Sequence, residues 1–140
     1  MFASPRNAAR AYASIGVHTG AMAASPHQLI AMLFEGAMIA ILKARQHMAA
    51  ANVLQKGIAI NHAVSIIDSG LRGALNLREG GELARNLDAL YSYMTLRLTA
   101  AHRENDPAKL QEVYKLLADL KSTWEAIAPH CPAAPAAMES

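Results

Sequence analysis

Apolar side chains recur at steps of three and four residues along four stretches of the chain, at 26–50, 53–78, 82–103 and 107–128. This spacing is that of one face of an α-helix. Ser25, Pro26 and Gln28 form a helix-start signature, and a Gly-Gly pair at 80–81 separates the second stretch from the third. Short turns make consecutive helices antiparallel. The pattern therefore predicts an all-α fold, an antiparallel up-down-up-down four-helix bundle at 25–128, with a short N-terminal lid segment at 1–24 and a flexible tail at 129–140.

The third and fourth stretches each carry a regular apolar stripe that is predicted to face the core of the bundle. On the fourth stretch the spacing follows a heptad closely. Trp124 belongs to this stripe, and a buried indole N–H needs a hydrogen-bond acceptor. The stripe residues are Leu83, Leu87, Leu90, Met94 and Leu98 on the third stretch, and Leu110, Val113, Leu117, Leu120, Trp124 and Ile127 on the fourth.

The first stretch differs because it is apolar almost all round. Its predicted core face is Leu29, Ile30, Leu33, Gly36, Ala37, Ala40 and Ala44. Further apolar residues lie on its other sides, and such a helix must be covered on more than one side. Two neighbouring helices do not cover that surplus, so we expect it to contact another protein. The surplus residues are Phe34, Met38, Ile39 and Leu42.

The second stretch carries two parallel seams. The predicted core stripe is Ile60, Ala63, Val64, Ile67, Leu71 and Ala74. The second seam is rich in small residues, and interior glycines cost roughly 1 kcal/mol each relative to alanine. Close helix packing explains the glycines taken alone, whereas the surplus on the first helix favours a trough that receives a helix of a partner. The candidate partner contacts in this seam are Ile66, Gly70 and Gly73.

Asn86, Tyr93 and Arg97 lie together along one edge of the third helix. In a plain amphipathic helix such residues are simply solvated. A polar and aromatic edge beside a clean core face also suits contact with a partner, and these three residues are therefore further candidates.

Composition narrows the class of protein. Hydrophobic residues make up 53% of the 140-residue chain, charged residues 17%, and the formal net charge is +2. This is a globular composition without a basic run, so nucleic acid is not expected as a partner. Cys131 is the only cysteine, which excludes an internal disulfide and fits a reducing compartment. Glu35, Lys43 and Arg45 interrupt the longest apolar stretch and no secretory signal is evident, so we expect a cytoplasmic protein without membrane insertion.

The sequence lacks the patterns of catalysis and metal binding. No two of the six histidines are three or four residues apart, and no nucleophile elbow or phosphate loop is evident. We therefore expect neither enzymatic activity nor a metal or cofactor. A general scaffold that binds a helix of another protein is one alternative. A histidine phosphotransfer bundle, with His62 or His102 as the modified residue, is a lesser one.

Two long motifs resemble the FliS family of flagellar secretion chaperones. Residues 25–37, SPHQLIAMLFEGA, are similar to the family's S-P-x-x-L-I-x-M-L-Y-[DE]-G-A opening of its first long helix. Residues 80–94, GGELARNLDALYSYM, are similar to its G-G-E-I-A-x-N-L-x-x-L-Y-x-Y-M signature. Ala11-Tyr12 before Val17-His18-Thr19, and the leucine pairs and late tryptophan of 110–124, extend the resemblance over roughly 10–128. Residues 20–23 intervene where the family often has a compact V-x-T-A-S-P, and Phe34 stands where tyrosine is frequent.

The resemblance implies a cytoplasmic chaperone without enzymatic activity. Members of the family bind the disordered C-terminal region of flagellin one-to-one, prevent its premature polymerisation, and help to deliver it to the membrane export gate. The client wraps around the bundle as short helices in apolar grooves. The N-terminal segment of the free chaperone can occupy one of these grooves. We therefore expect Tyr12, Ile15 and Val17 to fold back as a lid, with Tyr12 as its anchor.

Overall fold

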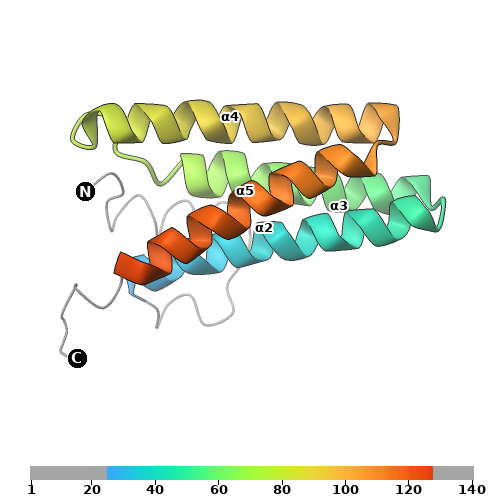
Figure 1. The fold of residues 1–140 in the computed structure, drawn as a ribbon, viewed down its shortest axis with the longest axis horizontal. Helices are drawn as coiled ribbons and strands as arrows, with labels where there is room; N and C mark the ends of the chain where they lie inside the picture. The colour runs from blue at the N-terminus through green and yellow to red at the C-terminus, as the bar shows by residue number, and fades with distance from the viewer. Residues whose placement is uncertain (1–24, 128–140) are drawn as a thin grey trace.

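The computed structural model describes residues 25–127. They form an all-α four-helix bundle without strands in that range (Figure 1), which confirms the predicted fold class. The helices are α2 (Pro26–Ala49), α3 (Val53–Ser65) continued by the π-helix η2 (Ile66–Arg72), α4 (Gly81–Glu104) and α5 (Pro107–Ile127).

Local capping explains where the helices begin. Ser25 Oγ accepts from the Gln28 N–H at 3.1 Å, and Gln28 Oε1 accepts from the Ser25 N–H at 2.9 Å, which is the predicted capping box of α2. Asn52 Oδ1 caps α3 by accepting from the Gln55 N–H at 3.2 Å. The Gly-Gly turn before α4 places Gly81 at φ +59°, in the left-handed region that favours glycine.

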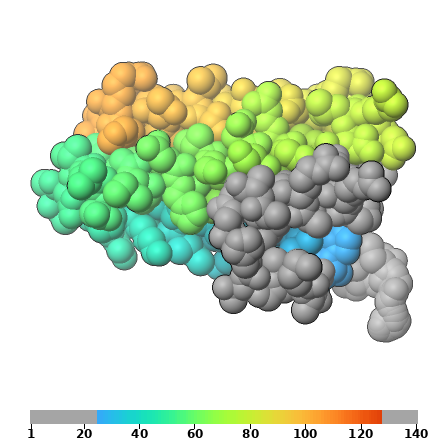
Figure 2. All heavy atoms as spheres, turned by 180° about the vertical axis from the view of Figure 1, so that it is seen from behind, coloured from blue at the N-terminus to red at the C-terminus, as the bar shows by residue number. Residues whose placement is uncertain are grey.

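Consecutive helices run in opposite directions, as Figure 1 shows for α4 and α5. The α2 helix packs against α3, η2 and α5, and α4 packs against α3, η2 and α5. Seen from behind, α3 and α4 lie beside each other on one face (Figure 2). The four helices thus enclose one core. Its most deeply buried larger side chains include Leu33, Ile41, Ile60, Ile67, Tyr91, Met94, Leu98, Leu110, Val113 and Leu117.

The second helix departs from its predicted course. It was expected to continue to residue 78, but it widens into η2 and ends at Arg72. The Arg72 Nε donates to Asp88 Oδ1 of α4 at 2.6 Å, and its Nη1 donates to Asp68 Oδ1 at 3.0 Å. A π-turn holds one residue more than an α-turn, so a pattern of 3.6-residue period cannot reveal it. The tertiary bond from Arg72 to Asp88 lies at this shift of register.

Two core assignments on α4 also change. Leu83 was expected in the core but is 55% exposed, whereas Tyr91 is 2% exposed and belongs to the core. Tyr91 lies one position from the predicted Leu90, which is only partly buried. The buried face of α4 is therefore rotated slightly from the leucine stripe, toward Ala84, Leu87, Tyr91, Met94, Leu98 and Ala101.

Among the described helices, α2 is long and apolar enough to cross a membrane by length and composition alone. The charged residues that were expected to exclude a membrane-spanning helix do not exclude one by themselves. The packing gives another reason for its apolar composition, because α3, η2 and α5 all cover α2. The covered sides of α2 are apolar for this reason, while Ile39 and Leu42 remain exposed.

Candidate functional site

An apolar cavity of about 180 Å³ opens between α2, α4 and α5. Phe34 forms part of its wall on α2. Almost all of the exposed surface of the cavity is carbon, so water inside it would find few hydrogen-bond partners. Burial raises the pKa of Tyr91, so this phenol stays neutral in the wall. The lining residues are Phe34, Leu83, Leu87, Tyr91, Leu120, Thr123, Trp124 and Ile127.

The cavity forms because the apolar stripes of α4 and α5 extend beyond the parts of these helices that their neighbours cover. Leu83 lies in the first turn of α4 and Ile127 is the last residue of α5. Both lie on the predicted core stripes, yet they remain 55% and 46% exposed. The sequence placed all these lining leucines in the core. The signal that was missed is the position of Leu83 and Ile127 at helix ends, where no neighbouring turn covers a core-facing side chain.

Trp124 is fixed in the cavity wall by the start of α2. Its Nε1 donates to the His27 carbonyl at 2.9 Å. This carbonyl is the acceptor that a buried indole N–H was predicted to need. The His27 ring stacks on the indole with centroids 4.3 Å apart and planes 8° from parallel. The wall of the cavity is therefore joined to the first turn of α2, 97 positions away in the sequence.

Only some of the surplus apolar residues predicted on α2 are exposed. Ile39 is 43% exposed and Leu42 is 38% exposed, as expected, and Met38 is partly buried. The expectation was wrong for Phe34, which is 3% exposed and reaches inward to line the cavity. The oblique packing of α5 on α2 covers this side (Figure 1).

The predicted trough on the second helix is closed. Ile66 and Gly70 are buried, and a Cβ on Gly70 would lie 2.9 Å from Leu33 Cδ2 of α2. The alternative of close helix packing is therefore correct here. The residues of η2 at 66, 67, 70 and 71 are all buried. Gly73 follows η2 and is exposed.

The polar edge of α4 forms hydrogen bonds with α5. The Tyr93 hydroxyl donates to Glu112 Oε2, and the Arg97 Nε donates to Glu112 Oε1 at 2.7 Å. The Arg97 guanidinium lies 5.9 Å from the centre of the Tyr93 ring. The Tyr93 hydroxyl and Arg97 together lower the pKa of Glu112. Asn86 is exposed on the same helix.

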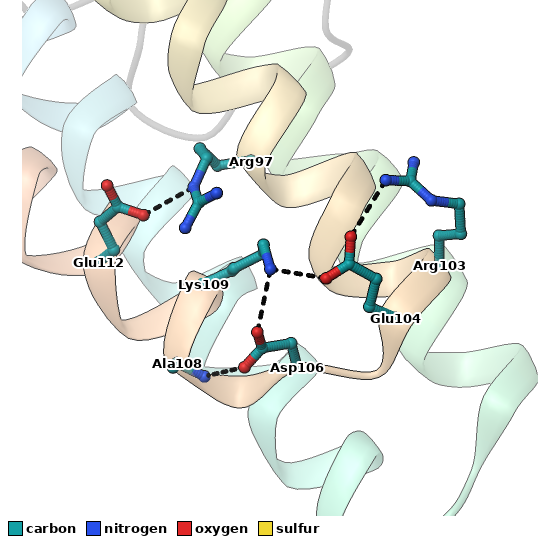
Figure 3. Close-up of polar contacts among 7 residues, drawn as sticks. All are labelled: Arg97, Arg103, Glu104, Asp106, Ala108, Lys109 and Glu112. Carbon is teal, nitrogen blue, oxygen red and sulfur yellow. Dashed lines mark hydrogen bonds and ion pairs between the residues drawn. The ribbon is translucent and has the colours of Figure 1, made fainter.

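Figure 3 shows how this polar seam continues to the turn between α4 and α5. Lys109 Nζ bridges Glu104 Oε1 at 2.6 Å and Asp106 Oδ2 at 3.1 Å. Asp106 Oδ1 also accepts from the Ala108 N–H at 2.9 Å and so caps α5. These contacts hold the end of the bundle that lies farthest from the cavity.

A second exposed apolar group lies on α3 and was not predicted. Val53, Leu54 and Ile58 are 65%, 72% and 54% exposed. Leu54 and Ile58 are four residues apart and so share a face of the helix. Neither of the two seams predicted on this helix includes these residues.

Tyr12, Ile15 and Val17 lie outside the described residues, as do the lid segment and the tail. Within 25–127, no cluster of three or more histidine, cysteine or acidic side chains could hold a metal ion.

The comparisons with known proteins agree on one family. A family model described as flagellar protein FliS matches residues 8–131. The chain belongs to the FliS family. It is 44% identical over 120 residues to the flagellar secretion chaperone FliS of Salmonella typhimurium, covering 86% of this chain and 89% of the relative.

Two other relatives show similar agreement. The flagellar secretion chaperone FliS of Escherichia coli is 40% identical over 116 residues, covering 83% of this chain and 85% of that protein. The flagellar secretion chaperone FliSB of Pseudomonas aeruginosa is 42% identical over 120 residues, covering 86% and 94%. The match therefore spans nearly the full length of these FliS proteins, and the four-helix bundle described above is the structure of a FliS family member.

Proposed function

We propose that this chain is a flagellin export chaperone of the cytoplasm without enzymatic activity. In this proposal it binds the disordered C-terminal region of flagellin one-to-one, keeps it from polymerising, and aids its delivery to the membrane export gate. The observation that carries the proposal is the open apolar cavity between α2, α4 and α5 in a member of a secretion-chaperone family.

The size and chemistry of the cavity suit one side chain of a client helix. An apolar cavity of about 150 Å³ in another protein stays dry and binds benzene. The 180 Å³ cavity here can therefore receive one leucine-sized or phenylalanine-sized group. Peptides that bind in this way place the apolar face of an amphipathic helix into a groove.

A client that folds on binding must offset its loss of conformational entropy with extensive apolar contact. One cavity is too small for this. The exposed strip of Ile39 and Leu42 with Met38 beside it provides a second contact region on α2. We assign Gly73 and Asn86, which are exposed, to the periphery of the client-binding surface. Tyr93 and Arg97 contribute through the same edge of α4 while they hold Glu112.

Leu83→Asp is expected to weaken binding of the flagellin C-terminal region by more than tenfold. The carboxylate would stand at the rim of an apolar cavity and would lose its water when a client helix covers it. Asp suits the first turn of a helix, so the bundle itself should remain folded. Isothermal titration calorimetry of the purified proteins gives affinity and stoichiometry together.

Leu96→Asp is the matched control, because Leu96 is a 67% exposed leucine of the same helix that does not line the cavity. It adds the same charge and should leave affinity within about twofold, since Leu96 does not line the cavity. Equal losses in both variants would remove the cavity from the binding surface. Wild-type protein that binds other helical proteins as well as flagellin would favour the general scaffold.

Deletion of residues 1–17 tests the proposed lid, which lies outside the described part of the chain. If the segment competes with the client, its removal should tighten flagellin binding or leave it unchanged. The gain in affinity depends on the fraction of time that the lid is closed in the full chain. Free protein should self-associate more readily, because apolar surface loses its cover. Size-exclusion chromatography and calorimetry measure the two effects. Weaker binding after the deletion would show that the segment holds the client instead.

A further inference from the structure

His27 holds the indole of Trp124 by two separate groups. Its ring stacks on the indole at 4.3 Å, and its backbone carbonyl accepts the indole N–H at 2.9 Å. The same indole forms a wall of the apolar cavity. The orientation of that wall is therefore coupled to the side chain at position 27.

The surroundings of the imidazole favour its neutral form. His27 Nε2 is buried and has no hydrogen-bond partner within 25–127. A neutral ring can leave this nitrogen unprotonated, whereas the imidazolium would bury an N–H without an acceptor. His27 is also the second residue of α2, at the positive end of the helix dipole, which disfavours a cation.

Two neighbours act in the opposite direction. The charge of Glu125 on α5 favours the imidazolium, as does the face of the indole. Glu125 also forms an ion pair with Lys121, and Lys121 pairs in turn with Glu35 of α2 at 3.4 Å. From α4 the cavity receives only Leu83, Leu87 and Tyr91, which carry no charge.

Burial outweighs these neighbours. It lowers the pKa of His27 below the usual value of 6.5, while a hydrogen bond with the Trp124 backbone and the charge of Glu125 offset part of the effect. A client that covers the cavity would remove more water from the ring and would disfavour the imidazolium further.

We infer that His27 is a positioning residue of the cavity, and that its neutral ring holds Trp124 in the client-binding orientation while protonation weakens client binding. This inference rests on the proposed function, because it assumes that the client occupies the cavity. It gives the chaperone a pH dependence that belongs to one side chain. Position 27 is a variable position of the motif that carried the family resemblance, so the property is specific to chains with histidine there.

The first experiment needs no client. Trp124 is the only tryptophan, so fluorescence excited at a wavelength that the four tyrosines do not absorb reports on this ring. Between pH 8.0 and 5.0 the wild-type emission should follow a single titration with its midpoint below 6.5. His27→Phe, which keeps an aromatic stack but cannot titrate, should show no transition. His62→Gln and His130→Gln should retain it. Identical titrations in wild type and His27→Phe would overturn the inference.

The second experiment measures affinity for the flagellin C-terminal region by calorimetry at pH 7.5 and 5.5. Wild type should bind roughly threefold to tenfold more weakly at the lower pH, since one coupled proton changes affinity by at most about tenfold per pH unit. His27→Phe should bind equally at both values. His27→Ala should already bind more weakly at pH 7.5, because the indole loses its stack.

These outcomes separate the inference from the proposed function. Circular dichroism establishes that each variant is folded, and His27→Gln replaces His27→Phe if the latter is not. Equal losses of affinity in wild type and His27→Phe would overturn the pH role of His27 and leave the chaperone function standing. No binding by any variant at pH 7.5 would overturn the proposed function, and the fluorescence titration would then decide alone whether His27 controls the cavity wall.

Discussion

Replacing Trp124 by alanine is expected to lower the free energy of unfolding by about 3 to 5 kcal/mol, the usual cost of truncating a buried tryptophan. Trp124 is 5% exposed and donates to the His27 carbonyl. Its loss would enlarge the existing cavity and detach the end of α5 from the start of α2. Since small domains have only about 5 to 15 kcal/mol of stability, the variant should be marginally folded. Urea unfolding followed by circular dichroism measures the change.

Trp124→Phe is the control that separates the ring from its hydrogen bond. Phenylalanine keeps an aromatic ring against His27 but removes the N–H donor and one of the two fused rings, so the expected cost is about 1 to 3 kcal/mol, smaller than for alanine. A cost for Trp124→Ala that is no larger than this would mean that the indole contributes little packing. Equal denaturant slopes in the variants are needed for the comparison, because a changed slope signals a changed unfolded or native state.

Gly70→Leu should lower the free energy of unfolding by about 1 to 3 kcal/mol, since an added side chain overfills a closed core. Even a Cβ at this position would lie 2.9 Å from Leu33 Cδ2 and 3.4 Å from Leu33 Cδ1. Leu33 is 1% exposed and has little free space into which it can move. Thermal or urea unfolding measures the loss. Affinity for flagellin, measured where the variant is folded, should stay near that of wild type.

Gly36→Ala supplies the matched control from the facing helix. A Cβ there would meet only Ile66 Cδ1, at 3.4 Å, and alanine gains about 1 kcal/mol of helix propensity. This variant should be as stable as wild type or slightly more stable. If Gly70→Leu abolished flagellin binding at full stability, the closed packing between η2 and α2 would have to open when the client binds.

The outline of the bundle could be predicted from local sequence signals. Capping at Ser25 and the Gly-Gly turn at 80–81 depend on residues a few positions apart, and each marks the start of a helix that the structure contains. The α5 stripe was also correct through Leu110, Val113, Leu117 and Trp124, because a regular heptad leaves one buried face. The need of Trp124 for an acceptor followed from its chemistry alone.

The candidate site could be predicted only in part. Ile39 and Leu42 were correctly expected at the surface, because they lie opposite the core face of α2. Phe34 was misplaced, since its burial depends on how α5 crosses α2. The cavity itself was missed, because helix ends in different parts of the chain leave it uncovered at one end of the bundle.

The sequence by itself determined the helices, their order and most of the core, because hydrophobic periodicity and capping act within a few residues. It also determined the family, through two motifs that each lie within one helix and its entry. Only the tertiary structure decided the π-turn at 66–72, the burial of Gly70 and the position of the cavity. These depend on partners such as Leu33, Asp88 and His27, whose distance along the chain gives no local pattern to read.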